Sequence, residues 1–143
     1  MDTTDRMSNT AELAVADLMA IEPVVVSVDA TIEEAERLLS AYRIHGLPVV
    51  DGNGRLVGVI SQTDLFESSH VRLGSRMRGD PSGIRVGTLM TSPAVTVPMT
   101  ASLAEAARVM RDAYVHRVVA IDDEGRPVGV LAAFDYVTLA ADA

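Results

Sequence analysis

The chain repeats itself, and this repeat limits the folds that it can adopt. When residue 15 is aligned with residue 86, an offset of 71, the two copies run forward without a gap. Over positions 15–64 the copies share 17 identical residues, where chance would give about 3. The fold must therefore contain the same supersecondary unit twice.

The two copies also predict the same order of elements. Thr31-x-x-Glu34 and Ser102-x-x-Glu105 have the spacing of a capping box, and apolar residues follow at helical spacing. Short β-branched runs indicate strands, and Gly-containing turns between the last two runs of each copy predict hairpins. The predicted strands cover 24–28, 47–50 and 56–60 in the first copy and 95–97, 118–121 and 128–131 in the second. A helix then closes each copy, so the unit is β-α-β-β-α and the predicted fold class is α/β (α+β).

The repeat divides the chain into four segments. Residues 1–14 form a lead-in, 15–72 the first repeat, 73–85 a linker and 86–140 the second repeat. The stretch 67–85 is polar, contains glycine and carries arginines with few acids, which is typical of a helix tail followed by a loop. A solvated surface is the simplest interpretation of these arginines, and contact with a phosphate or a partner is the alternative.

Composition excludes several classes of protein. The chain has no cysteine, which excludes disulfides, thiolate metal sites and cysteine nucleophiles. A net charge of −8 argues against a nucleic-acid partner, because electrostatic binding of the phosphate backbone needs a basic face on the protein. No apolar run approaches the roughly 18–20 residues of a membrane span, and residues 1–9 lack an apolar signal core. We therefore expect a cytoplasmic protein without a membrane or nucleic-acid partner.

Residues 58–64, Gly-Val-Ile-Ser-Gln-Thr-Asp, combine the end of a strand with the start of a helix. Ser61 has the place of a helix N-cap, and Asp64 stands three positions later. A carboxylate there can accept hydrogen bonds from the vicinal hydroxyls of a ribose, and a helix start can hold a phosphate. Taken alone, these residues favour a plain capping box, and a small nucleotide cradle is the second interpretation.

Nothing in the sequence indicates catalysis. The three histidines, His45, His70 and His116, have neither cysteine nor clustered acids at the spacing of a metal site. No nucleophile is matched with a base. The acidic turn 122–124 is most simply a solvated turn, because turn carboxylates alone lack the oxygen cage of a calcium loop. We expect no catalytic residues, no metal and no catalytic cofactor.

The combination of these features resembles a known family. Both copies carry a Leu-Met start, an [Ser/Thr]-x-x-Glu-Ala helix opening and a closing Gly-h-x-x-x-x-Asp, where h is hydrophobic. Over about residues 15–140 this pattern resembles a tandem CBS-domain pair, also called a Bateman module. The resemblance implies two repeats packed about a pseudo-twofold axis with two clefts between them, and frequent pairing of modules into a homodimer. It also implies binding of adenosine nucleotides that regulate a partner.

The family's ligand motif, Gly-h-x-[Ser/Thr]-x-x-[Asp/Asn], is matched in full by Gly58, Val59, Ser61 and Asp64. The resemblance implies that Asp64 binds ribose hydroxyls and Ser61 a phosphate. It also implies that each cleft draws on both copies. The nucleotide-binding residues expected on this basis are Ile60, Ser61, Asp64, Val95, Val115, His116 and Arg117.

The second copy departs from the motif. Asp135 is kept, but Ala132 stands where the hydroxyl should be. That change also removes a helix cap, which is worth about 1 kcal/mol. We expect a weaker or empty second cleft lined by His45 and Asp135. For His45 and His116 the alternative to a ligand role is an ordinary polar residue that covers a strand end.

Two functions remain open on this evidence. The leading hypothesis is a regulatory module that binds AMP, ADP or ATP, with S-adenosylmethionine less favoured, and that signals by conformational change to an unknown protein effector. The alternative is a homodimerisation or scaffold module without a ligand, which the damaged motif of the second copy supports.

Overall fold

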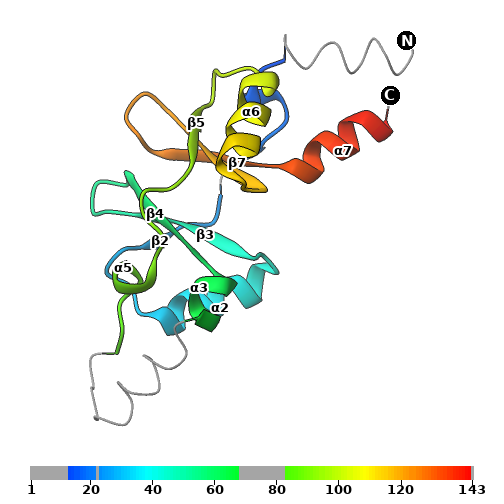
Figure 1. Ribbon diagram of the computed structural model, residues 1–143. Helices are drawn as coiled ribbons and strands as arrows, with labels where there is room; N and C mark the ends of the chain where they lie inside the picture. Colours follow the sequence, from blue (N-terminus) through cyan, green and yellow to red (C-terminus); the bar gives the residue numbers. More distant parts are fainter. Residues whose placement is uncertain (1–12, 22, 68–82, 143) are drawn as a thin grey trace. The chain divides into compact units, whose positions relative to one another are not determined.

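The computed structural model describes residues 13–21, 23–67 and 83–142 (Figure 1). Most of the predicted lead-in and of the linker lies outside these residues, as do His70 and three of the arginines between the copies, Arg72, Arg76 and Arg78. The chain forms two compact units. The first-copy unit is Val24–Ala94, and the second-copy unit combines Met1–Pro23 with Val95–Ala143.

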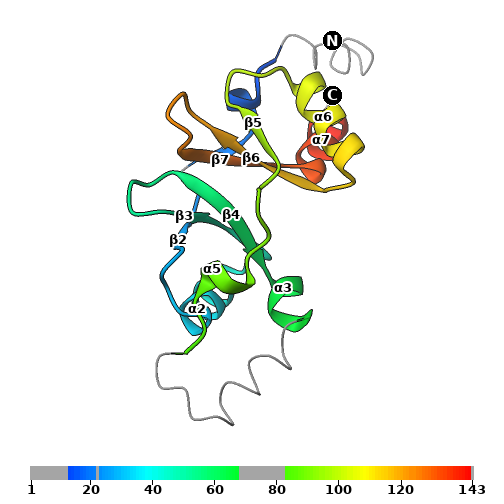
Figure 2. The ribbon, with the colours of Figure 1, turned by 60° about the vertical axis from the view of Figure 1, so that its left-hand side comes forward.

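The first-copy unit contains a three-stranded sheet in the order β2-β3-β4. Strand β2 is parallel to β3, and β3 forms an antiparallel hairpin with β4. Both views place helices α2 and α3 on the same side of this sheet (Figures 1 and 2). The elements in chain order are β2 (Val26–Ser27), α2 (Ile32–Tyr42), β3 (Gly46–Val50), β4 (Leu56–Ser61), α3 (Gln62–Glu67) and α5 (Val86–Leu89).

The second-copy unit repeats this arrangement with one more strand, in the order β1-β7-β6-β5. Strand β5 is parallel to β6, and β6 forms an antiparallel hairpin with β7. Its elements are the 3-10 helix η2 (Val15–Asp17), β1 (Ala20–Ile21), β5 (Thr96–Pro98), α6 (Leu103–Ala113), β6 (Arg117–Ile121), β7 (Pro127–Ala132) and α7 (Ala133–Ala141). The predicted β-α-β-β-α unit is therefore confirmed in both copies.

The start of each copy packs on the sheet of the other copy. Strand β1 precedes the first copy but pairs with β7, with Ala20 opposite Val130. Thr91, which follows α5 at the start of the second copy, forms a bridge with Val59 on β4. These two pairs have the same register under the offset of 71. The boundaries of the sequence repeats and of the compact units therefore differ. The first segment of each repeat belongs to the compact unit that holds the rest of the other repeat.

Local chemistry explains where the two long helices begin. Thr31 accepts a hydrogen bond from the backbone N–H of Glu34 at 3.3 Å, and Ser102 accepts one from Glu105 at 3.1 Å. These are the N-cap contacts that the capping-box spacing predicts. The Glu34 carboxylate turns to Arg37 instead of closing the box, and this pairing lowers the pKa of Glu34.

Each unit has its own aliphatic core. The side chains of Ile32, Leu47, Val49, Ile60 and Val86 are buried in the first-copy unit, and those of Val15, Leu103, Val118 and Leu131 in the second-copy unit. The helical spacing of apolar residues predicts a buried face of α2 that runs from Ile32 to Tyr42. That prediction is wrong at its end, because Leu39 is buried but Tyr42 is exposed. Burial of these branched side chains supplies most of the drive to fold in a chain with few aromatics.

Candidate functional site

The turn from β4 to α3 is a closed network of hydrogen bonds. The Ser61 N–H and hydroxyl both donate to Oδ2 of Asp64, at 2.9 and 3.0 Å. The Asp64 N–H in turn donates to the Ser61 hydroxyl oxygen at 3.1 Å. Both residues are half-buried. The capping box that the sequence predicts here is therefore formed in full.

A third residue joins this turn from 27 positions away. The hydroxyl of Thr91 donates to Oδ1 of Asp64 at 2.9 Å. The backbone of Thr91 is fixed, because its N–H and carbonyl are both paired with Val59 at 2.8 and 3.0 Å. The neighbouring Ser92 hydroxyl donates to the Val57 carbonyl at 2.8 Å. The sequence analysis missed Thr91, and its place directly after the repeated Leu-Met pair was the available signal.

The matching turn of the second copy is simpler. The Ala132 N–H donates to Oδ2 of Asp135 at 2.8 Å, and Ala132 has no hydroxyl to return a hydrogen bond. Ala20 occupies the register that Thr91 has in the other unit, again without a hydroxyl. Next to Asp135, the Tyr136 hydroxyl donates to the Leu103 carbonyl at 2.6 Å. Burial, and secondarily the charge of Asp135, raises the pKa of Tyr136 to about 12.

His45 and His116 each lie at the strand–helix turn of their own unit. The His45 carbonyl accepts the Gln62 N–H at 3.0 Å, and its Nδ1 lies 3.0 Å from the Gln62 amide oxygen. In the second-copy unit the His116 carbonyl accepts the Ala133 N–H at 2.7 Å. Arg117 stands opposite Ala132 in the β6–β7 ladder. The structure thus brings His45 to the Ser61 turn and His116 and Arg117 to the Ala132 turn.

The aliphatic residues of the predicted site are largely parts of the cores. Ile60 is fully buried, with Leu47 opposite it in the β3–β4 ladder, so its side chain belongs to the core of its unit. Val95 and Val115 are half-buried against the core of the second-copy unit. A role of any of these three in ligand binding stays a prediction.

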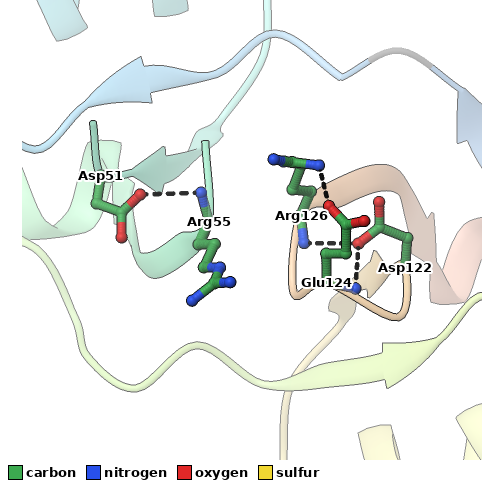
Figure 3. A network of polar contacts seen from close by, with 5 residues as sticks. All are labelled: Asp51, Arg55, Asp122, Glu124 and Arg126. Carbon is green, nitrogen blue, oxygen red and sulfur yellow. Dashed lines mark hydrogen bonds and ion pairs between the residues drawn. The ribbon is translucent and has the colours of Figure 1, made fainter. Parts of the chain in front are cut away.

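Both hairpin turns are held by an aspartate (Figure 3). Asp51 accepts the N–H groups of Asn53 and Arg55 at 2.8 and 3.0 Å, and Asp122 accepts those of Glu124 and Arg126 at 2.9 Å each. These backbone donors hold the pKa of each carboxyl below its ordinary value. Glu124 also pairs with the Arg126 guanidinium. Part of the negative charge of the turn 122–124 therefore stabilises the turn itself, through the contacts of Asp122 and Glu124.

The described part of the chain holds neither a metal-binding cluster nor a membrane-spanning helix. Within residues 13–21, 23–67 and 83–142, no group of three or more His, Asp and Glu side chains is placed to hold a metal ion. In the same part of the chain, no helix has the length and apolarity needed to cross a membrane.

Comparisons with known proteins agree on one family. The family model for the CBS domain matches residues 15–70 and 86–142. A CBS domain-containing protein of Dictyostelium discoideum is 30% identical over 132 residues, which cover 90% of this chain and 91% of that protein. The crystal structure of CBSX2 in complex with AMP, a protein of Arabidopsis thaliana, has a TM-score of 0.77 and 30% identity. The match covers 91% of this chain and 97% of CBSX2.

Other relatives are much longer. The inosine-5'-monophosphate dehydrogenase of Mycobacterium tuberculosis is 29% identical over 119 residues, which are 83% of this chain. The chain spans about a fifth of that enzyme's length, since the match covers 21% of it. The family match of both copies, together with the repeated fold, confirms the resemblance seen in the sequence. The chain belongs to the CBS domain family and carries two copies of the domain.

Proposed function

We propose that this chain is a regulatory CBS pair that binds an adenosine nucleotide through the Ser61–Asp64 turn, without catalytic activity of its own. The likeness to CBSX2 in complex with AMP carries the proposal, because it extends over nearly the whole of both chains. AMP, ADP and ATP are the favoured ligands, and S-adenosylmethionine is less favoured. The binding event then regulates a separate protein effector.

The chemistry of the turn supports this assignment. Asp64 offers carboxylate oxygens that can accept from ribose hydroxyls. The Ser61 hydroxyl donates to Oδ2 of Asp64, and it can donate to a phosphate by turning away from that oxygen. Both groups are held in place by the capping box, so part of the cost of ordering them is met before a ligand arrives. Val95, Val115, His116 and Arg117 were assigned to the same ligand from the family pattern, and their part is proposed on that pattern alone.

A scaffold module without a ligand is the second candidate. Two observations favour it. The hydrogen bonds of Ser61 and Asp64 satisfy a helix cap by themselves. Several large apolar side chains are also exposed on α3 and α7, namely Phe66, Phe134 and Val137. Exposed apolar side chains on one helix, as Phe134 and Val137 are on α7, are typical of a surface for association between chains.

Calorimetric titration with AMP, ADP, ATP and S-adenosylmethionine separates the two candidates. The proposal expects one of them to bind, and Asp64→Ala to abolish binding at that site. Asp123→Ala, which removes an exposed turn acid of the second copy, is the matched control and should bind as the wild type does. A folded protein that binds none of the four, together with a stable dimer in solution, would favour the scaffold.

Arg117→Ala and His116→Ala test the residues assigned from the family pattern. If these side chains face a phosphate, both substitutions weaken AMP binding and leave adenosine binding nearly unchanged. Equal weakening of the two ligands would assign these side chains a structural role at the start of β6, beside the Ala132 turn.

A further inference from the structure

We propose that the Ala132–Asp135 turn is a second nucleotide site, in which Arg117 meets the phosphate in place of the hydroxyl that Ala132 lacks. This inference rests on the proposed function and adds a second ligand to it. It also gives Arg117 a different ligand from the one that the family pattern assigns. Its basis is a difference between the two copies at one pair of strand positions.

At this pair of positions the two copies carry their polar side chain on opposite strands. Gly46 stands opposite Ser61 in the β3–β4 ladder, and Arg117 stands opposite Ala132 in the β6–β7 ladder. The two pairs correspond under the offset of 71. Each turn therefore has one polar side chain at this pair, a hydroxyl from β4 in the first copy and a guanidinium from β6 in the second.

The two positions of the pair lie close to each other. A β-carbon on Gly46 would stand 3.8 Å from the β-carbon of Ser61, and its nearest neighbour would be the Ile60 carbonyl oxygen at 3.6 Å. A side chain would therefore fit at position 46, so packing does not explain the glycine of the first copy. In the second copy the same antiparallel pairing places the β-carbons of Arg117 and Ala132 about 5 Å apart.

Arg117 and Ala132 also share a face of the sheet. Next to them in the ladder, Val118 stands opposite Leu131, and both of these side chains are buried in the core of the unit. Because side chains alternate along a strand, Arg117 and Ala132 lie on the face that points away from this core. Arg117 is exposed there. Its guanidinium can therefore reach the place that a serine hydroxyl would have at position 132.

The charges at this turn match a ligand that carries a diol and a phosphate. Among the residues that the structure describes, no carboxylate pairs with Arg117, whereas Arg37 and Arg126 each have a glutamate partner. Asp135 accepts the Ala132 N–H at 2.8 Å through Oδ2. Its carboxylate can also accept from ribose hydroxyls, and a guanidinium can bind a phosphate through two N–H groups. The ligand class is thus a nucleoside phosphate, and a nucleoside alone lacks the group that Arg117 binds.

Two aspartate variants separate the turns, and two ligands isolate the phosphate. Asp64→Ala leaves only the second turn able to bind, and Asp135→Ala leaves only the first. AMP and adenosine differ only in the phosphate, so the ratio of their affinities, measured by calorimetric titration, reports contacts to that group. In the Asp64→Ala protein we expect Arg117→Ala to lower this ratio about tenfold, which corresponds to about 1.4 kcal/mol. In the Asp135→Ala protein the ratio should not change.

Three further variants of the Asp64→Ala protein control this measurement. Arg117→Lys keeps the positive charge and should keep most of the ratio. Adding Ala132→Ser to Arg117→Ala supplies the hydroxyl of the first copy and should restore part of the ratio. Arg108→Ala removes another exposed arginine of the same unit, from α6, and should leave the ratio unchanged. If Asp64→Ala does not fold, as judged by circular dichroism, the wild-type background replaces it, and there Arg117→Ala should weaken one of two bound AMP molecules.

The outcomes separate this inference from the proposed function. If Arg117→Ala leaves the ratio unchanged in the Asp64→Ala protein, or lowers it equally in both proteins, the inference is overturned and the proposed function stands. Binding of AMP to Asp135→Ala but not to Asp64→Ala has the same meaning. Binding of AMP to Asp64→Ala but not to Asp135→Ala supports the second site and contradicts the proposed function. A wild-type protein that binds no AMP removes both.

Discussion

The sulfur of Met90 lies 2.7 Å from the point where a β-carbon on Gly58 would stand, and the carbonyl oxygen of Thr91 lies 2.8 Å from it. Gly58 is therefore required by the close approach of the segment that follows α5. The methionine side chain can move, but the Thr91 backbone is paired with Val59 and cannot give way easily.

We expect Gly58→Ala to lower the free energy of unfolding by about 1–3 kcal/mol, the usual cost of overpacking. Urea denaturation measures it. Gly52→Ala is the control, because nothing lies within 4 Å of a β-carbon there. Equal destabilisation by the two substitutions would contradict the assignment of Gly58 to close packing.

Tyr136 should make the protein sensitive to alkali. Its pKa is about 12 in the folded chain, above the value near 10 of an unfolded tyrosine. The folded state therefore holds the phenolic proton more tightly, so this stabilisation is complete below about pH 10 and is lost as the pH rises toward 12. Tyr136→Phe should remove the part of the stability loss at high pH that is due to this phenol. At neutral pH it should cost about 1 kcal/mol, because the hydrogen bond to Leu103 is gone.

Denaturation of Tyr136→Phe and of the wild type between about pH 8 and pH 11.5 checks this prediction. Tyr114→Phe serves as the control, since Tyr114 is 93% exposed and the substitution should leave the profile unchanged. The prediction is wrong if Tyr136→Phe follows the wild-type curve throughout.

The hairpin aspartates Asp51 and Asp122 should make the stability of the fold depend on pH in the acid range. Backbone donors lower the pKa of Asp51 and of Asp122 below the ordinary value near 3.8. Each carboxylate therefore stabilises the fold fully above that value, and the stabilisation is lost as the pH falls through the lower folded-state pKa. Asn keeps an acceptor oxygen but has no charge to titrate.

The double variant Asp51→Asn, Asp122→Asn should thus be less stable than the wild type at pH 7 and lose less stability below about pH 4. Thermal unfolding as a function of pH measures both effects. Asp123→Asn, at the neighbouring exposed acid, should leave the loss of stability at low pH unchanged. If the double variant loses as much stability as the wild type below about pH 4, the stability of these turns does not depend on the charge.

The elements that short-range chemistry controls could be predicted from the sequence. Thr31 and Ser102 begin helices because a hydroxyl three residues before a backbone N–H makes a cap. The hairpins follow from Asp-x-x-Gly turns between β-branched runs. The Ser61–Asp64 cap followed from the same reasoning, because both partners lie within one turn of chain.

The long-range contacts could not be predicted in this way. The segments that begin the two copies share the same Leu-Met pattern, so nothing in either one says which sheet it joins. Thr91 meets Asp64 across 27 positions. Its place after the repeated Leu-Met pair marks the segment, but nothing local identifies Asp64 as its partner. The helix ends at Arg43 and Tyr114 were also hidden, because both residues adopt the left-handed conformation without the glycine that usually signals it.

The second copy should gain stability from the hydroxyl that it lacks. Ala132 is the N-cap of α7 with extended backbone, φ −110° and ψ 151°, and its N–H already reaches Asp135. In Ala132→Ser the new hydroxyl oxygen can accept the Asp135 N–H, as Ser61 does for Asp64. We expect a gain of about 1 kcal/mol in the free energy of unfolding, and a similar loss in Ser61→Ala. Ala133→Ser, one residue inside the helix, cannot cap it and should bring no gain. Urea denaturation of all three variants measures these changes in the free energy of unfolding. Equal effects of Ala132→Ser and Ala133→Ser would show that a hydroxyl at the cap position does not stabilise α7 specifically.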